Sequence, residues 1–555
     1  MLSIPDRLKK VLFKFRFQLL LLVLWLIVRI IINPMGNFAI NDDWAYAHDA
    51  QVLVEKKVFW FSYWPAMTLI SQTFWGTLFC KIFGFSLFNL RMATMVLSIL
   101  GSLTFFSLIK KVVINEKTSF LITVALLANP IYLGLSFTYM TELYYLSFTC
   151  FYLFFLAQFF RRDRLIDWGL ACFFLILTVL VRQTGLILPI AFAFIYFLSK
   201  RLSIRTFLVA VLPFVIAFSS IEIYKILRAQ VDPTLGNLSE IGDLFRSISN
   251  MSLAFSIERI GLIFMLVGLM LTPVSLLLLS QLKKVTYRRK IIHLSLLLIP
   301  VLLVMFSVWN RFPQGPILGN FELGPRLTKD VTLFSQNTAQ PISGVIWGLL
   351  KCLSIFSISV LIIRTYSLFE RDQEKSSTIL DKVREHPFVC MIIVLFLFQC
   401  TYVVINPNFF DRYVLPMMFS GLILLAFLIK DVRLVHQKIS VGITALFLIV
   451  STLLVRDLFS WHRARQNCTN YLQFEMDISP SDIDGGFEYN GYLSVYGINP
   501  NPIKTTDKSW WFVNNDDYLI TCGEFEGYER IRAVSANQLI STSSDSVYIL
   551  RKIVD

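Results

Sequence analysis

Residues 170–198 read LACFFLILTVLVRQTGLILPIAFAFIYFL and carry a single charged side chain, Arg182. A bilayer crossing needs about 20 mostly apolar residues. With its flanking residues the stretch therefore predicts two spans, at 166–181 and 184–199, that meet at Arg182 and Gln183. An ionisable group at this depth is costly and usually belongs to a site or a salt bridge.

The rest of the chain has the same apolar character. Of its 555 residues, 56% are hydrophobic and 16% are charged, where about 45–50% and about 25% are usual. So few charges cannot cover a water-soluble surface, which excludes a cytosolic enzyme, a disordered chain and a fibrous repeat. The sequence predicts an all-α polytopic membrane protein. The net charge of +14 then indicates basic loops on the inner side of the membrane, and no nucleic-acid partner is expected.

Thirteen stretches are apolar and long enough to be candidate spans. They lie at roughly 17–33, 89–109, 118–137, 142–160, 166–181, 184–199, 206–224, 259–280, 291–309, 343–363, 388–405, 413–429 and 439–455. An odd number of crossings would place the two ends of the chain on opposite sides of the membrane.

Lysine and arginine concentrate in alternate loops. These loops are 1–16, 110–117, 161–164, 200–205, 283–290, 364–384 and 430–438. Short basic loops face the cytoplasm. We therefore expect a cytoplasmic N-terminus, an extracytoplasmic C-terminus and a location in the plasma (inner) membrane.

Three regions are expected on the outer side. The first outer loop, 34–88, contains an interrupted apolar stretch at 65–88 that predicts one or two amphipathic interfacial helices. A second long outer loop covers 310–342. From Arg456 the sequence becomes polar and rich in turns, with short alternating runs typical of strands. This predicts a transmembrane domain over 1–455 and a small α/β or β-rich domain over 456–555.

Two of the eight cysteines, Cys468 and Cys522, fall in this outer domain. An oxidising compartment permits a disulfide between them, and two separate buried thiols are the alternative.

The most unusual polar residues are all expected at the outer face. Asp42 and Asp43 follow the first span, Glu142 begins the fourth, Arg182 ends the fifth, and Arg412 lies between the eleventh and twelfth. Each has a plain structural explanation: the aspartates can cap a helix, Glu142 and Arg182 can form a salt bridge, and Arg412 can anchor a helix end. Their combination at one face instead predicts a functional site. Carboxylates act as general bases and cation ligands, and arginine matches phosphate, so the set suits a lipid-phosphate donor and a hydroxyl acceptor.

The order of these motifs resembles the GT-C glycosyltransferases of family 39, which include the protein O-mannosyltransferases and the bacterial aminoarabinose transferase that modifies lipid A. The chain is most similar to an uncharacterised bacterial branch of this family. Five motifs carry the resemblance: Asp42, Asp43, Tyr46 and Ala47; Phe83–Ser86 with Arg91; Thr141 and Glu142; Arg182–Gly185; and Asp411–Pro416. The loop 310–342 has no counterpart that we can place, and Glu142 stands where aspartate is frequent.

The resemblance implies a GT-C fold and the inverting transfer of a hexose or pentose from a polyprenyl phosphate to a lipid, glycan or protein acceptor. It implies that Asp42 is the general base and that Arg182 and Arg412 bind the donor phosphate. Asp43 and Glu142 would be further catalytic carboxylates, and they could hold a divalent cation. Substrate contacts are expected from four neighbouring residues: Tyr46, His48, Gln183 and Tyr413.

Two other classes of protein handle lipid-linked sugars at the outer face. A flippase or transporter would use the same charges without chemistry, but transporters commonly contain inverted repeats, and the sequence shows no such symmetry. A polysaccharide polymerase or ligase typically relies on a histidine in a large outer loop, and the loop 310–342 has no histidine. Release of polyprenyl phosphate distinguishes a transferase from a flippase.

Overall fold

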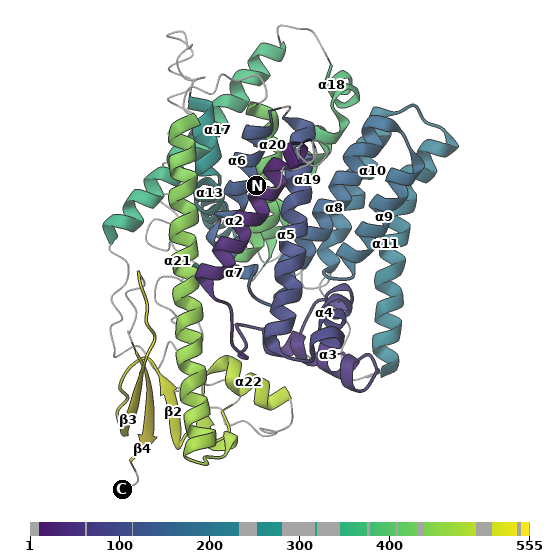
Figure 1. Cartoon of the computed structure of the whole chain (residues 1–555). Coiled ribbons are helices and arrows are strands. Elements are labelled where there is room, and N and C mark those ends of the chain that lie inside the picture. The colour runs from purple at the N-terminus through teal and green to yellow at the C-terminus, as the bar shows by residue number, and fades with distance from the viewer. Residues whose placement is uncertain are drawn as a thin grey trace.

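The computed structural model describes most of the chain as helix, with one small sheet near the C-terminus (Figure 1). The described residues are 10, 12–61, 64–113, 115–231, 252–279, 317–318, 344–373, 378–406, 409–429, 437–495, 513–540 and 546–553.

Eight helical stretches in the described ranges are long and apolar enough to cross a membrane. They contain α5 (Leu87–Val112), α8 (Thr141–Arg162), α11 (Ile204–Val231), α13 (Leu253–Ser275), α17 (Gly344–Gln373), α19 (Pro387–Ile405), α20 (Leu415–Ile429) and α21 (Gln437–Asn470). These helices confirm the prediction of a helical, multi-pass membrane protein.

Shorter helices account for several other predicted spans. They are α2 (Arg16–Ile32), α6 (Glu116–Leu127), α7 (Pro130–Leu135), α9 (Leu165–Val179) and α10 (Ile187–Ser199). The span predicted at 118–137 is thus two helices, because Asn129 caps α7 through the amides of Ile131 and Tyr132 and Pro130 begins it. The span predicted at 291–309 lies outside the described residues, so the total of thirteen crossings stays a prediction.

The region predicted to be the first outer loop, 34–88, contains two short helices at one end of the bundle (Figure 1). These are α3 (Asp43–Glu55) and α4 (Ile70–Phe83), and α4 falls in the stretch predicted to be interfacial. Arg91 on α5 holds the segment that leads into α3. Its guanidinium donates to the carbonyl oxygens of Pro34, Gly36 and Phe38, at 2.8, 2.9 and 2.5 Å.

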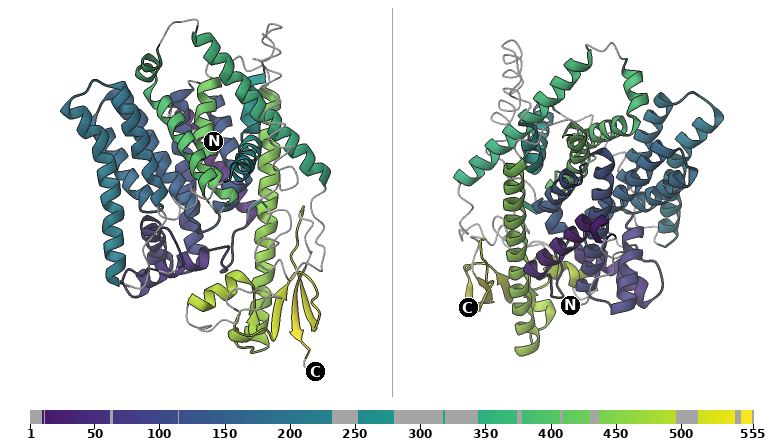
Figure 2. Two further views of the ribbon diagram at one scale, coloured as in Figure 1. Left: turned by 180° about the vertical axis from the view of Figure 1, so that it is seen from behind. Right: turned by 45° about the horizontal axis from the view of Figure 1, so that its top comes forward.

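The C-terminal sheet lies at the same end of the molecule as α3 and α4 (Figures 1 and 2). Its strands are β1 (Ile483–Asp484), β2 (Tyr518–Thr521), β3 (Tyr528–Ser535) and β4 (Ser546–Lys552), in the order β1-β2-β4-β3. β1 and β2 are parallel, and β4 is antiparallel to both β2 and β3. The helix α22 (Phe487–Val495) follows β1.

The helix α21 joins the bundle to this sheet. The predicted span at 439–455 continues as one helix to Asn470, so the change of composition at Arg456 falls inside a helix. The C-terminal half of α21 supplies Trp461, Ala464 and Cys468 to a core shared with strand residues such as Ile520 and Val547.

Cys468 and Cys522 are both free thiols in this structure. The structure therefore agrees with two separate thiols and not with a disulfide between them. The Cys468 thiol faces the Val547 carbonyl at 3.8 Å, and Cys522 accepts a hydrogen bond from the Trp461 indole at 3.1 Å. Each sulfur therefore has its own partner in the core.

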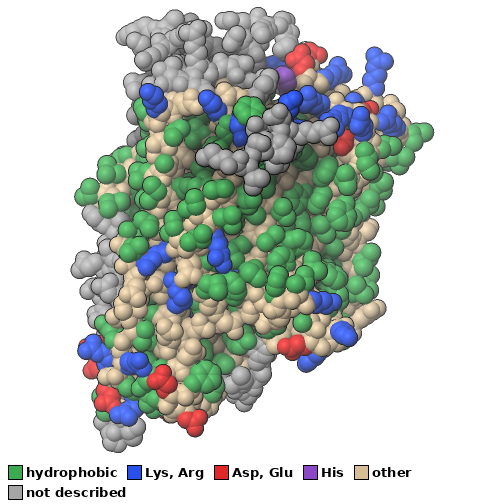
Figure 3. Space-filling view, in the orientation of Figure 1, with side chains coloured by type: hydrophobic (Ala, Val, Ile, Leu, Met, Phe, Trp, Pro, Cys, Tyr) green, Lys and Arg blue, Asp and Glu red, His purple; other side chains and the backbone are tan. Residues whose placement is uncertain are grey.

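Side-chain chemistry divides the surface into bands (Figure 3). Hydrophobic side chains cover the middle of the face shown, and lysine and arginine gather at the end opposite the sheet. The loops that join α8 to α9 and α10 to α11 supply basic residues there, including Arg161, Arg162, Arg164, Lys200 and Arg201. The sheet end carries both signs of charge.

Candidate active site

Asp42 stands at the entry to α3 but does not cap it, since its side chain accepts no hydrogen bond from the first helical turn. Asn41 just before it has a φ of 56°, a left-handed conformation that asparagine tolerates better than most residues. The Asp42 carboxylate accepts a hydrogen bond from the Trp64 indole at 3.0 Å and lies 3.5 Å from Nη2 of Arg412. The helix-cap explanation is therefore wrong, because the side chain faces an arginine from a distant segment.

Glu142 lies in the first turn of α8, where the partial positive charge of a helix N-terminus favours a carboxylate. Its side chain is only 3% exposed. Oε1 lies 2.5 Å from Nη2 of Arg182 and 3.1 Å from Nε of Arg412. The predicted Glu142–Arg182 salt bridge is present, but it is one part of a larger group.

Arg182 and Arg412 reach this group from two different turns. Arg182 lies between α9 and η1 (Gln183–Leu186), and its Nε donates to the Thr141 hydroxyl at 2.6 Å. Arg412 belongs to η4 (Asp411–Val414), which leads directly into α20. We call Asp42, Glu142, Arg182 and Arg412 the charged cluster. It brings together four segments that are far apart in the sequence.

Three buried polar atoms of the cluster have no hydrogen-bond partner within the described residues: Oε2 of Glu142, and Nε and Nη1 of Arg412. Nε is in ion-pair contact with Glu142, so Nη1 is the guanidinium nitrogen left free. Buried charged groups are normally satisfied, and leaving one unsatisfied is expensive. The arrangement is therefore suited to a ligand that supplies the missing partners. An anion would satisfy the free guanidinium nitrogen.

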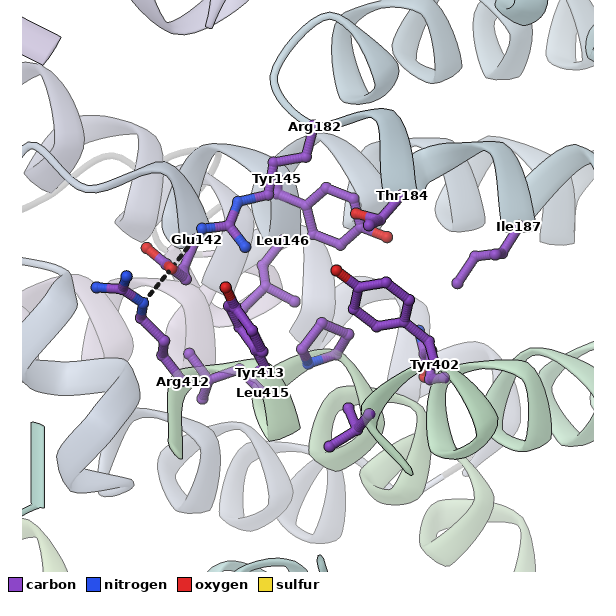
Figure 4. Close-up of a pocket in the computed structure, with 13 residues that line it drawn as sticks. Glu142, Tyr145, Leu146, Arg182, Thr184, Ile187, Tyr402, Arg412, Tyr413 and Leu415 are labelled. Carbon is purple, nitrogen blue, oxygen red and sulfur yellow. Dashed lines mark hydrogen bonds and ion pairs between the residues drawn. The ribbon is translucent and has the colours of Figure 1, made fainter. Parts of the chain in front are cut away.

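Three members of the charged cluster, Glu142, Arg182 and Arg412, line a pocket (Figure 4), whereas Asp42 is not among the lining residues. The hydroxyl of Tyr413 points towards Glu142 and Arg182, and Tyr402 lies across the pocket from them. The Arg182 guanidinium lies 5.9 Å from the centre of the Tyr413 ring. Tyr145, Thr184, Leu146 and Ile187 complete much of the lining, so charged and hydroxyl groups adjoin apolar ones. Such a lining suits a ligand with a polar head and an apolar tail.

Asp43 has a hydrogen-bond partner outside the charged cluster. Its Oδ1 accepts a hydrogen bond from the Tyr139 amide at 3.0 Å. Burial raises the pKa of Asp43 from 3.8 to about 7, although the Tyr139 amide and the charge of Arg91 act in the opposite direction.

A cation site formed by Asp43 and Glu142 fits these residues poorly. In the described part of the chain, no group of three or more His, Cys, Asp or Glu side chains could hold a metal ion. Asp43 is bonded to a backbone amide, and its raised pKa favours the protonated form, which is a poor ligand.

The four predicted substrate contacts have different surroundings. Tyr413 lines the pocket. Tyr46 is buried, with its hydroxyl 3.9 Å from the sulfur of Met67, and burial raises its pKa well above 10. Gln183 donates to the Ala66 carbonyl at 3.0 Å, and the His48 ring meets Trp60 edge-on at 6.1 Å. None of Tyr46, Gln183 and His48 is among the pocket-lining residues.

Three site features were not predicted from the sequence. Trp64 binds Asp42, and the tyrosines Tyr145 and Tyr402 line the pocket. Both tyrosines lie inside predicted spans, where an aromatic residue gives no distinct signal. Asp411 also has a role of its own: its carboxylate accepts from the amides of Ile317 and Leu318, at 3.0 and 2.7 Å.

Comparison with known proteins supports the predicted resemblance. Residues 72–225 match the model of the family described as dolichyl-phosphate-mannose-protein mannosyltransferase. The matched segment contains Glu142 and Arg182, and it begins after Asp42 and ends before Arg412. A search of curated proteins finds no match.

Two solved structures are similar over most of their length. One is ArnT from Cupriavidus metallidurans in the apo state, with 10% sequence identity and a TM-score of 0.40, covering 90% of this chain and 87% of that chain. The other is ArnT from the same organism bound to undecaprenyl phosphate, with 10% identity and a TM-score of 0.42, covering 98% of each chain.

Proposed function

We propose that this chain is a membrane glycosyltransferase that moves a sugar from a polyprenyl phosphate to an acceptor hydroxyl on the extracytoplasmic side. The observation that carries the proposal is the meeting of Arg182, Glu142, Arg412 and Asp42 beside a pocket with an apolar lining. The match of residues 72–225 to a family described as a mannosyltransferase acting with dolichyl phosphate supports the same class of reaction.

In the proposed reaction the acceptor oxygen attacks the anomeric carbon, and the bond from that carbon to the phosphate oxygen breaks. The acceptor loses its proton to a carboxylate, and the lipid phosphate leaves with the bonding electrons. Attack opposite the leaving group inverts the configuration at the anomeric carbon. A base near the acceptor and cations near the phosphate are the two groups that this step requires.

Asp42 is the carboxylate best placed to act as the base. Glu142 is held by two guanidinium groups at 2.5 and 3.1 Å, whereas Asp42 lies 3.5 Å from a single one. Asp42 is also more exposed, at 15% against 3% for Glu142. Glu142 therefore positions the arginines, and Asp42 remains accessible to an acceptor.

The arginines are placed to bind the donor phosphate. Arg412 has a buried nitrogen without a hydrogen-bond partner in the described ranges, and both guanidinium groups line the pocket. A guanidinium suits phosphate because its donors are planar and its charge is permanent. The apolar lining would take the first part of the lipid tail, and undecaprenyl phosphate is the carrier that we expect.

The proposed orientation places the charged cluster on the extracytoplasmic side. The basic loops gather at the end of the bundle opposite the sheet, and basic loops favour the cytoplasm. The end with α3, α4 and the sheet would then face outward in the inner membrane.

The test uses the purified protein in liposomes with a panel of undecaprenyl-phosphate sugars, pentoses and hexoses among them. A transferase releases undecaprenyl phosphate in an amount that matches the glycosylated acceptor. Movement of an intact donor across the bilayer without that release would show a flippase and overturn the proposal. An extract of envelope lipids and glycans serves as the source of acceptor.

A further inference from the structure

The C-terminal helix α22 packs directly on the helix that begins at the charged cluster. Gly491 of α22 lies against Trp44 of α3, and a Cβ at this glycine would lie 2.6 Å from an indole carbon. Phe487, one α22 turn earlier, meets the Trp44 ring edge-on, with 5.9 Å between the ring centroids. The two elements are thus in close contact although more than 400 residues separate them.

A buried ion pair lies beside this contact. Nη1 of Arg465, on α21, donates to Oε2 of Glu488 at 2.8 Å, and the two side chains are 5% and 1% exposed. The second oxygen of Glu488 accepts a hydrogen bond from the backbone amide of Asn41 at 3.2 Å. Burying two charges is costly, so a pair of this kind is weak evidence for a gain in stability, and removing one partner leaves the other charge buried and unpaired.

The Asn41 amide belongs to the residue immediately before Asp42. The backbone of Asn41 is in the left-handed conformation, with a φ of 56°. The hydrogen bond from its amide to Glu488 stabilises this less favourable conformation. The direction in which the Asp42 side chain leaves the backbone depends on this turn.

A second path joins α22 to the same carboxylate. The ring of Trp44 packs against the ring of Trp64, with 5.2 Å between centroids. Phe487 also contacts Trp64, at 6.0 Å. The Trp64 indole donates to Oδ1 of Asp42 at 3.0 Å. The backbone and the side chain of Asp42 are therefore both supported by groups that α22 contacts.

We propose that Glu488, held by Arg465, is a positioning residue for Asp42, and that α22 makes the C-terminal domain a working part of the site. The inference rests on the proposed function, in which Asp42 takes the acceptor proton. Without the Glu488 carboxylate the Asn41 amide loses its acceptor, and the Asp42 carboxylate loses its fixed distance to the acceptor oxygen.

A cavity adjoins the ion pair and makes a specific test possible. It is lined by Arg465 and Glu488 together with Gln473, Tyr492 and other side chains, among them Asn37 from the segment before α3. In a Glu488→Ala protein a small carboxylate such as formate could enter from this cavity and replace the missing group. A purely structural loss of packing would not respond to formate.

The experiment measures release of undecaprenyl phosphate by wild type and Glu488→Ala in liposomes. We expect kcat to fall roughly 10- to 100-fold, the scale of a misplaced catalytic group, with the donor KM unchanged. Formate should restore part of the loss. Glu488→Gln should lie between the two, because it keeps an oxygen for the Asn41 amide but loses the charge that pairs with Arg465.

A matched control is Glu529→Ala, which removes an exposed glutamate paired with Arg551 in the sheet. This change should leave kcat unaltered. If Glu488→Ala does not yield folded protein, Gly491→Ala takes its place, since the added methyl group must move Trp44. We expect at least a tenfold loss of kcat at constant donor KM for that variant as well.

The possible failures are distinguishable. A wild-type protein that releases no undecaprenyl phosphate contradicts the proposed function. An active wild type whose activity survives Glu488→Ala, or survives Gly491→Ala where that variant is used, overturns the positioning role alone. A loss in Glu488→Ala that formate does not relieve also overturns it.

Discussion

At the scale of single residues, the site depends on how two carboxylates share two arginines. Glu142 lies between Arg182 and Arg412, and Arg412 also faces Asp42. The sequence placed all four at one face of the membrane, and it allowed a simple Glu142–Arg182 salt bridge. It could not show that Arg412 connects both acids, because that contact depends on how η4 approaches α8.

Arg412→Ala should weaken donor binding by about 1.5–3 kcal/mol, the value of a hydrogen bond to a charged group. The variant removes the guanidinium whose Nη1 has no hydrogen-bond partner in the described ranges. Arg412→Lys should restore part of the affinity, because lysine keeps the charge but loses the planar fork. Donor KM and undecaprenyl-phosphate binding measure the effect, and an unchanged KM in a folded Arg412→Ala protein would remove Arg412 from the phosphate site.

Asp43 should make stability depend on pH. An unfolded aspartate loses its proton near pH 4, whereas burial raises the pKa of the folded Asp43 to about 7. The folded state therefore binds more protons over this interval, so the free energy of unfolding should fall as the pH rises towards 7 and then level off.

Asp43→Asn resembles the protonated side chain and keeps an oxygen for the Tyr139 amide. Thermal melting between about pH 5 and about pH 8 should be less pH-dependent in this variant than in wild type, and the variant should melt at the higher temperature at about pH 8. Parallel pH profiles for the two proteins would contradict the assignment.

At the scale of elements, hydropathy predicted the helices well and their ends less well. The break at Asn129 and Pro130 was visible as a capping residue followed by proline, yet the apolar run continued through it. The opposite occurred in α21, where polar residues follow Arg456 but the helix continues. Gln466 there donates to the carbonyl of Asn37 at 3.2 Å, a distant contact that no local pattern contains.

The segment before α3 should depend on Arg91. This arginine is fully buried and donates to three carbonyl oxygens of that segment. Arg91→Met should leave those acceptors unsatisfied and lower the melting temperature, at a cost of about 1–3 kcal/mol for each one that water cannot reach. Arg29→Met is the control and should have little effect, because the Arg29 guanidinium donates to the sulfur of Met35 at 3.8 Å and not to the segment before α3.

At the scale of the whole molecule, the central feature is the division into a basic end and an end that carries α3, α4 and the sheet (Figures 1 and 3). Composition and the distribution of lysine and arginine were enough to predict a multi-pass protein with a polar C-terminal domain. They were not enough to predict that α22 packs against α3. That contact depends on the absence of a side chain at Gly491, which leaves room for the Trp44 ring, and composition carries no information about such a fit.

The orientation of the chain can be tested with two new cysteines. Arg201→Cys lies in a basic loop and Ser535→Cys on an exposed strand of the sheet. In intact cells a membrane-impermeant thiol reagent should label Ser535→Cys above the wild-type background and should label Arg201→Cys only after the cells are opened, because the basic loop is cytoplasmic. The reverse pattern would place the charged cluster on the cytoplasmic side.

The most direct test of the account is the rate at which wild type and Asp42→Asn release undecaprenyl phosphate from a sugar donor. Asparagine keeps the shape of the side chain and can still accept from the Trp64 indole, but it cannot take a proton. We predict a loss of turnover of roughly 10²- to 10⁴-fold, the usual contribution of a positioned base, with binding of undecaprenyl phosphate retained. Undiminished turnover in a folded Asp42→Asn protein would contradict the assignment of Asp42 as the base.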